Sequence, residues 1–245
     1  MPYAPRGTLT DLPAGHPCET CPVRPITICR GLDAPTLSGM RSLGTMQRLL
    51  AEQSVFHEGD PAKRVFMVTH GALKLYTLLA DGRRQVTGFM FPGDFLGISV
   101  DQDYAFSVEA LEPAELWWFS RDAFDRFVGD HPKVEHELYR LAAHELAAAQ
   151  QQMVLLGRKS AAERLASFFL SLLERSEHIS GTVETGFSLP MSRLDIADYL
   201  GLTKETVSRM LSDLRNRRLI RLKTQNYVEV LDRNSLRATA EGGMS

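Results

Sequence analysis

The chain has no apolar run that approaches the roughly 20 residues needed to cross a membrane. Its first residues also lack the basic and then apolar order of a secretory signal. Motifs of common enzyme classes are missing as well, since the sequence holds no Gly-rich phosphate loop and no nucleophile elbow. These absences predict a cytoplasmic protein that is not an enzyme and has no membrane partner.

Cysteine is scarce, and its three residues follow the spacing Cys18-x2-Cys21-x7-Cys29. In a cytosolic protein such a cluster favours metal binding over disulfide formation. The alternative is three thiols without a function in a short, irregular N-terminal segment.

The net charge of −2 does not by itself point to nucleic acid. The charge is divided unevenly, because residues 158–245 carry 14 Lys and Arg against 11 Asp and Glu. The first 157 residues carry 14 against 19. This asymmetry has the sign expected for a C-terminal half that binds DNA.

Residues 192–217 are the most informative stretch of the sequence. They predict two short helices joined by a tight turn at Gly201, the first opened by Ser192 with Asp195 three residues on, and the second opened by Thr203. Apolar residues at helical spacing would pack the two helices together: Ile196, Leu200, Val207, Met210, Leu211 and Leu214. An ordinary helical hairpin is the alternative. Residues 219–222 and 227–231 look like two strands, and this context favours a winged helix-turn-helix.

Glu205, Ser208 and Arg209 would lie on the outer face near the start of the second helix, where a helix-turn-helix reaches base edges. Arg209 can donate two hydrogen bonds to guanine, and Glu205 can accept one from cytosine. Ser208 can serve as donor or acceptor, or touch a thymine methyl group. Phosphate contacts are expected from Thr203, Lys204, Arg215, Arg217 and Arg218, with Arg221 and Lys223 in the same basic stretch.

Residues 45–120 alternate short β-like runs with turn signals, which predicts an antiparallel sandwich or jelly roll. The runs are residues 55–57, 64–68, 73–79, 85–90, 106–111 and 116–119.

Residues 133–156 contain no Gly or Pro and are rich in good helix formers. An apolar seam repeats there at alternating intervals of three and four: Tyr139, Ala142, Leu146, Ala149, Met153 and Leu156. A second stripe, Leu138, Leu141 and Leu155, is expected to face the β-domain. Packing within one chain would explain a single stripe, but two apolar faces favour a helix that also forms a homodimer.

These parts predict an α+β fold with an antiparallel β-roll of jelly-roll type, a long dimerisation helix and a C-terminal winged helix-turn-helix. We expect a cysteine-containing segment at 1–35, the β-roll at 36–130, the dimerisation helix at 131–157 and the DNA-binding domain at 158–245.

This order of parts resembles the CRP/FNR family of bacterial transcription regulators over nearly the whole chain. The matching segments are residues 59–60 (GD), 70–71 (HG), 81–85 (DGRRQ), 92–97 (PGDFLG), 161–165 (AAERL) and 196–209 (IADYLGLTKETVSR). The last segment is similar to the FNR/FixK branch, in which Glu, Ser and Arg at these spacings read a TTGAT half-site. The resemblance implies a dimer on double-stranded DNA with an inverted repeat, and RNA polymerase as a further partner.

In FNR-type sensors a similar cysteine cluster holds three corners of an oxygen-sensitive [4Fe-4S] cluster. The family's fourth cysteine follows an Ala-Leu-Glu, and after Ala110-Leu111-Glu112 its place falls at Trp117, which cannot ligate iron. We expect an iron–sulfur cluster on Cys18, Cys21 and Cys29, and hence an oxygen or redox response. Three possibilities remain for the missing ligand. A carboxylate from Glu115, Asp101 or Asp103 could complete the cluster, or zinc could bind the three cysteines together with His16. In the third, the thiols bind no metal.

Two further expectations concern regulation. An oxygen-gated dimer needs a marginal interface, and no seam residue is charged, with Ala149 where a repelling acid would act. We therefore expect a dimer that persists without the cofactor. Cyclic AMP is not expected, because the family holds its phosphate with an arginine and none lies between Arg84 and Arg121. Haem, which other branches use, stays an alternative.

Overall fold

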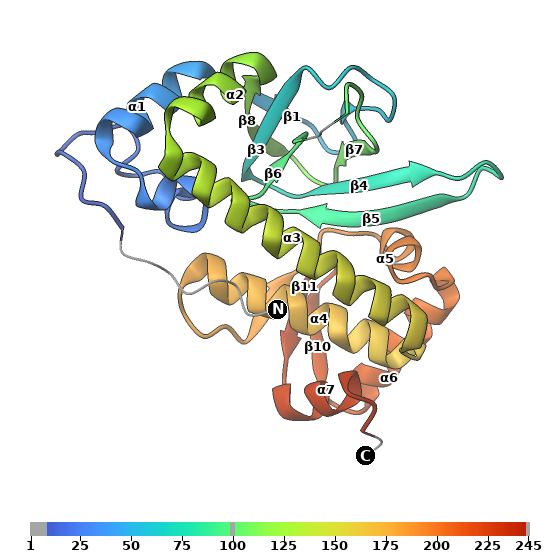
Figure 1. Cartoon of the computed structure of the whole chain (residues 1–245). Coiled ribbons are helices and arrows are strands. Elements are labelled where there is room, and N and C mark those ends of the chain that lie inside the picture. The colour runs from blue at the N-terminus through green and yellow to red at the C-terminus, as the bar shows by residue number, and fades with distance from the viewer. Residues whose placement is uncertain (1–8, 99–100, 244–245) are drawn as a thin grey trace. The chain divides into compact units, whose positions relative to one another are not determined.

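The computed structural model describes residues 9–98 and 101–243. The chain divides into two compact units, one formed mainly by residues 5–82 and 87–145 and the other by residues 146–245. The elements follow one another along the chain as labelled in Figure 1. No helix of the described residues is long and apolar enough to cross a membrane.

The first unit contains two four-stranded antiparallel sheets. One has the order β1 (Gly44–Leu49), β8 (Ala114–Ser120), β3 (Arg64–His70), β6 (Phe95–Leu96), and the other β2 (Ser54–Phe56), β7 (Ser107–Ala110), β4 (Leu73–Leu78), β5 (Arg84–Met90). An apolar core that includes Phe66, Val68, Leu75, Val108 and Leu116 holds the two sheets together. The predicted β-roll is therefore confirmed.

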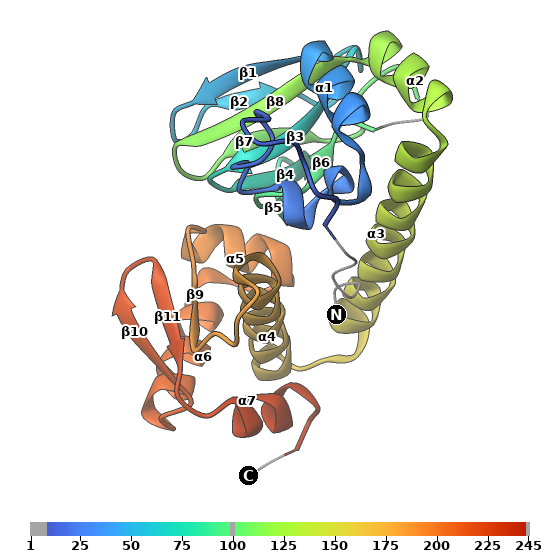
Figure 2. The same cartoon turned by 90° about the vertical axis from the view of Figure 1, so that its left-hand side faces the viewer.

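Alternation along β8 gives its sheet two apolar faces. Ala114, Leu116 and Trp118 pack with the β-roll core, whereas Trp117 and Phe119 belong to a second apolar cluster. This second cluster, named here the outer cluster, joins β3 and β8 to the helices beside the sheet (Figure 2). Those helices are η1 (Arg24–Ile26), η2 (Ile28–Gly31), α1 (Ala34–Leu43), α2 (Arg121–Asp130) and the start of α3 (Pro132–Arg158).

Within residues 9–35 the N-terminal segment is thus packed against the outer cluster. Val23, Ile28 and Leu32 are buried in the outer cluster, and the three cysteines pack against it. Whether the three thiols have a function stays a prediction.

The second unit contains a winged helix-turn-helix. It follows the order α4 (Ala161–Ser180), β9 (Gly186–Ser188), α5 (Arg193–Leu200), α6 (Lys204–Asn216), β10 (Ile220–Thr224), β11 (Tyr227–Val230) and α7 (Arg233–Ala240). The strands form one antiparallel sheet in the order β10-β11-β9. Ile196, Leu200, Val207, Leu211 and Leu214 are all buried, as their helical spacing predicts.

Candidate functional site

The α5–turn–α6 unit is fixed by local hydrogen bonds at each helix end. The Ser192 hydroxyl accepts from the Asp195 N–H at 3.1 Å, and the Asp195 carboxylate accepts from the Ser192 N–H at 3.1 Å, which completes a capping box. Gly201 ends α5 at φ +62°, a left-handed conformation that glycine adopts without strain. The Thr203 hydroxyl then accepts from the Thr206 N–H at 3.2 Å and starts α6.

The residues predicted to read bases lie on the exposed face of α6. Glu205, Ser208 and Arg209 are exposed, whereas Val207 and Leu211 on the other face are buried. The Ser208 hydroxyl donates to the Lys204 carbonyl at 2.9 Å, so its oxygen presents an acceptor to a base. The Arg209 guanidinium donates a long, weak hydrogen bond to the Thr206 hydroxyl at 3.5 Å.

The residues predicted to bind phosphate are exposed too, but they differ in their partners. Arg217 lies 3.6 Å from the Asp213 carboxylate, and Arg221 and Lys223 both pair with Glu229 at 3.1 and 2.9 Å. These three side chains therefore have acidic partners within the second unit. Thr203, Lys204, Arg215 and Arg218 are exposed at the start and end of the same helix.

The predicted seam of α3 lies open to solvent along most of its length. Tyr139, Leu146 and Met153 are 74%, 63% and 70% exposed. Ala142 and Ala149 are exposed as well, and Leu156 is half-buried. On the other side of the helix Leu138 and Leu141 pack against the outer cluster, as expected, whereas Leu155 is not part of that cluster. One apolar face of α3 therefore packs against the outer cluster, and the other is exposed to solvent.

The cysteine site combines three thiols with Trp117 against the outer cluster. Burial raises the pKa of the Cys29 thiol to about 11. Burial and the neighbouring Cys21 raise the pKa of Cys18, while Arg41 acts in the opposite direction. The Arg41 guanidinium also lies 5.0 Å from the centre of the Trp117 ring, so the place of the family's fourth cysteine holds a cation–π pair.

Among the described residues, none of the predicted fourth ligands joins the thiols in a group that could hold a metal ion. His16 Nδ1 accepts from the Cys18 N–H at 3.1 Å, so Nε2 carries the proton and donates to Ser38 Oγ at 2.9 Å. Glu115 pairs with Arg48 at 2.9 Å. Asp103 forms a β-bridge with Pro61. Within residues 9–98 and 101–243 no group of three or more Cys, His, Asp or Glu side chains is arranged to hold a metal ion.

The segment that contains the cysteines also holds a buried arginine. Arg24 is only 7% exposed, and its Nε has no hydrogen-bond partner among the described residues. Its charge acts on both Cys18 and Cys29. The described residues do not arrange the three thiols to hold a metal ion.

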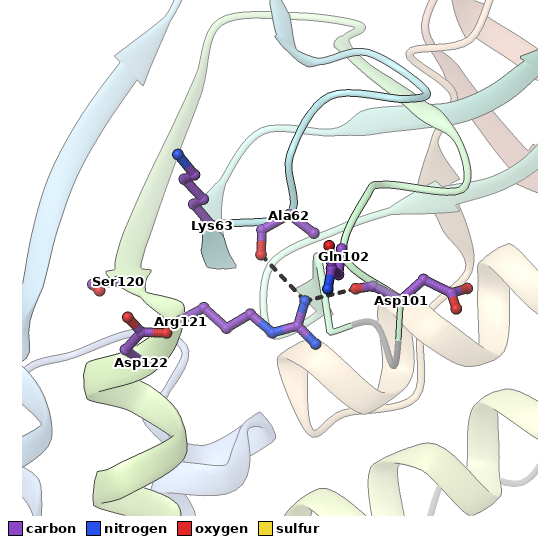
Figure 3. Close-up of a pocket in the computed structure, with 7 residues that line it drawn as sticks. All are labelled: Ala62, Lys63, Asp101, Gln102, Ser120, Arg121 and Asp122. Atoms are coloured by element: carbon purple, nitrogen blue, oxygen red, sulfur yellow. Dashed lines mark hydrogen bonds between the residues drawn. The ribbon is translucent and has the colours of Figure 1, made fainter.

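A pocket of about 440 Å³ lies elsewhere in the first unit, lined by Ala62, Lys63, Asp101, Gln102, Ser120, Arg121 and Asp122 (Figure 3). The Arg121 guanidinium reaches from the start of α2 and donates to the carbonyls of Ala62 at 3.2 Å and Asp101 at 2.9 Å. The Arg121 guanidinium therefore joins the loop that contains Ala62 to the loop that contains Asp101. Asp101, one of the predicted fourth ligands, lies in this pocket.

Sequence reasoning missed three arginines that the fold places at key contacts: Arg24, Arg41 and Arg164. The position of Arg24 between two cysteines was a signal that could have been used. Arg164 donates three hydrogen bonds to backbone carbonyls, of Leu156, Lys159 and Leu200, at 2.8, 2.8 and 2.9 Å. No local pattern indicates such long-range contacts.

Comparison with known proteins agrees with this architecture. Residues 163–239 match the Crp-like helix-turn-helix domain, and residues 46–131 match the cyclic nucleotide-binding domain. The chain is 42% identical over 202 residues to the nitrogen fixation regulation protein FixK of Bradyrhizobium diazoefficiens, covering 82% of this chain and 85% of that protein. It is 34% identical to the transcriptional activator protein FnrL of Cereibacter sphaeroides, covering 92% of each.

Among solved structures, FixK2 from Bradyrhizobium japonicum matches with a TM-score of 0.74 and 35% identity, over 80% of this chain and 96% of that one. The identity and coverage of these relatives agree with both domain matches. The chain belongs to the CRP/FNR family of transcription regulators, in its FNR/FixK branch.

Proposed function

We propose that the protein is a transcription activator that binds DNA as a homodimer, on an inverted repeat of TTGAT-type half-sites. The observation that carries the proposal is the exposed row of Glu205, Ser208 and Arg209 on the capped helix α6. Two such helices related by a two-fold axis would enter major grooves about one helical turn apart. RNA polymerase would then be the partner recruited at the promoter.

The proposed dimer uses the exposed seam of α3. A second copy of α3 would cover this seam, because the apolar residues recur at the intervals of a coiled coil. In such a dimer Tyr139, Leu146 and Met153 would be removed from water together. With no charged residue in the seam, we expect this dimer to persist in the metal-free protein, and a size measurement showing only monomer at micromolar concentration would contradict it.

Salt dependence tests the DNA-binding proposal directly. Affinity for a duplex with the inverted repeat should fall steeply between low and high salt, because several lysines and arginines displace counterions from phosphates. Affinity for a scrambled duplex should fall with a similar slope but from a lower starting value. A purely structural dimer would show neither the slope nor the difference.

Arg209→Ala is expected to weaken binding to the specific duplex by about 1–3 kcal/mol and to relax discrimination at the guanine position. The measurement is a titration of duplexes in which that base pair is changed to each alternative. Arg218→Ala is the matched control, because it should weaken binding to all duplexes alike and reduce the salt slope by about one. Uniform loss with Arg209→Ala would refute the base contact.

We also propose that Cys18, Cys21 and Cys29 hold an iron–sulfur cluster of the [4Fe-4S] type, which makes the activator responsive to oxygen. The support is the convergence of three thiols on one apolar cluster beside the orphaned donor of Arg24. When bound, such a cluster would supply a centre that oxygen oxidises. Protein purified without oxygen should absorb in the blue region, contain iron and sulfide, and bleach in air.

A regulator that binds zinc, or no metal, is the second candidate, and Trp117 at the place of the fourth cysteine favours it. Colourless protein without iron would support this candidate and leave the DNA-binding proposal unchanged. The zinc form would need a fourth ligand other than His16 in its present hydrogen bonds.

A further inference from the structure

The last turns of α3 belong to the same compact unit as the winged helix-turn-helix. The division between the two units falls inside this helix, after Glu145, so residues 146–158 are grouped with the DNA-binding domain. Two residues, Lys159 and Ser160, connect the end of α3 to the start of α4. Without further contacts, a connection of this length would let the DNA-binding domain pivot about the end of α3.

Gln152 lies on α3 before this connection and reaches the first helix of the helix-turn-helix. Its half-buried side chain donates from Nε2 to the Tyr199 carbonyl at 3.1 Å. Tyr199 and Leu200 end α5, where backbone carbonyls lack partners within the helix. Since Arg164 of α4 donates to the Leu200 carbonyl at 2.9 Å, the last two carbonyls of α5 both accept from side chains of neighbouring helices. The end of α5, directly before Gly201 and α6, is therefore fixed to α3.

Lys159 lies in the connection itself and joins it to two further helices. Its Nζ donates to Ser167 Oγ on α4 at 2.7 Å and to the Ala240 carbonyl at 2.9 Å. Ala240 is the last residue of α7, so the ammonium group also lies at a helix C-terminus, where a positive charge is stabilising. Lys159 therefore holds the connection against the DNA-binding domain, in addition to the bond that Gln152 makes from α3.

The part of α3 that is fixed in this way carries half of the proposed dimer seam. Leu146, Ala149, Met153 and Leu156 all lie within residues 146–158. Leu156 lies against the turn before α6, because a Cβ on Gly201 would be 3.5 Å from Leu156 Cδ2. A dimer formed through this seam would therefore hold each α6 at a set distance and angle from the two-fold axis.

We propose that Gln152 and Lys159 are positioning residues that set the half-site spacing to which the dimer binds. The inference rests on the dimeric DNA binding proposed above. One base pair inserted between the half-sites turns the second half-site by about 35° and moves it by about 3.4 Å along the duplex. A DNA-binding domain that is fixed to α3 does not follow this displacement, whereas a domain that pivots on the two-residue connection does.

The test measures affinity for three duplexes at one salt concentration: the inverted repeat, the same repeat with one more central base pair, and a single half-site. Wild-type affinity should fall by about 100-fold when the base pair is inserted, because the two half-sites are no longer bound together. In the double variant Gln152→Met with Lys159→Met this loss should shrink to about 10-fold or less, because each domain then pivots to its half-site. Methionine keeps the length of both side chains but donates no hydrogen bond.

The matched control is the double variant Gln151→Met with Arg158→Met, which changes exposed neighbours on the same helix and should keep the wild-type loss. Affinity for the single half-site separates positioning from damage to α6, and it should match the wild type in both double variants. If Gln152→Met with Lys159→Met does not fold, Gln152→Met alone removes one hydrogen bond and is compared with Gln151→Met. Its loss on insertion should also be smaller than that of the wild type.

A wild-type loss on insertion in the Gln152 variants overturns the positioning role. Reduced affinity of these variants for the single half-site overturns it too, because it indicates a structural effect on α6. A wild-type protein that prefers the inverted repeat to a scrambled duplex but tolerates the inserted base pair overturns this inference alone. A wild-type protein without preference for the inverted repeat overturns the proposed DNA-binding function as well.

Discussion

Leu146→Glu is expected to turn the protein into a monomer and to lower its affinity for a duplex with two half-sites by about 100-fold or more. Leu146 is 63% exposed in the middle of the predicted seam, between Ala142 and Ala149. In a parallel dimer the two glutamates would face each other across the two-fold axis in an apolar setting, which disfavours both charges. A monomer binds one half-site and loses the gain of about 10²–10⁴ that linked sites provide.

Gln151→Glu is the matched control for this prediction. It adds the same charge to the same helix, but position 151 lies on the side opposite the seam and is exposed. Molecular mass in solution and DNA binding should be measured for both variants in parallel. If Leu146→Glu stayed dimeric, or if both variants lost affinity equally, the seam would not be the dimer interface.

The features that could be predicted from the sequence are those with local signals. The capping box of Ser192 and Asp195, the turn at Gly201 and the cap of Thr203 each depend on a few adjacent residues, and the sequence predicts all three. The long helix α3 was found because its apolar pattern continues over many turns. The β4–β5 and β10–β11 pairs were found from strand runs on both sides of a turn signal.

The missed elements lack such signals. Half of the residues of β1 are exposed and its sequence is GTMQRL, so no alternation of apolar and polar residues marks it. β6 is two residues long, and β9 three, so both exist only through pairing with distant strands. Helix α1 contains a central Gly39, and its two buried residues gain stability from the outer cluster. These elements depend on tertiary contacts, which a single sequence does not display.

The candidate sites also contain some features with local sequence signals and others that depend on tertiary contacts. Glu205, Ser208 and Arg209 follow from helical periodicity once α6 is placed, and their exposure agrees with that reasoning. The clustering of the thiols was expected from their spacing. The convergence of Arg41 and Trp117 on them required the fold, since residues 41 and 117 come from α1 and β8. The boundaries of the domains at 35, 130 and 157, and the absence of cyclic AMP binding, stay predictions.

Arg164 is the source of the second large effect that we expect. Its guanidinium joins the carbonyls of Leu156 and Lys159 at the end of α3 to that of Leu200, the last residue of α5. Carbonyls at helix C-termini lack partners within the helix and carry partial negative charge, so a cation stabilises them. Gly201 follows directly, and a Cβ there would lie 3.4 Å from the same guanidinium.

Arg164→Met should therefore lower the free energy of unfolding of the C-terminal unit by about 3 kcal/mol, because three carbonyls lose a charged donor at once. It should also weaken specific DNA binding below the unfolding temperature, since the turn before α6 loses its tie to α3. Denaturant unfolding and a DNA titration on folded protein measure the two effects separately.

Arg158→Met, which changes an exposed arginine at the end of α3, is the control and should alter neither stability nor DNA binding. If Arg164→Met had wild-type stability, water would replace the guanidinium at these carbonyls. If it had wild-type DNA affinity, the packing of Ile196, Val207 and Leu211 alone would orient the recognition helix.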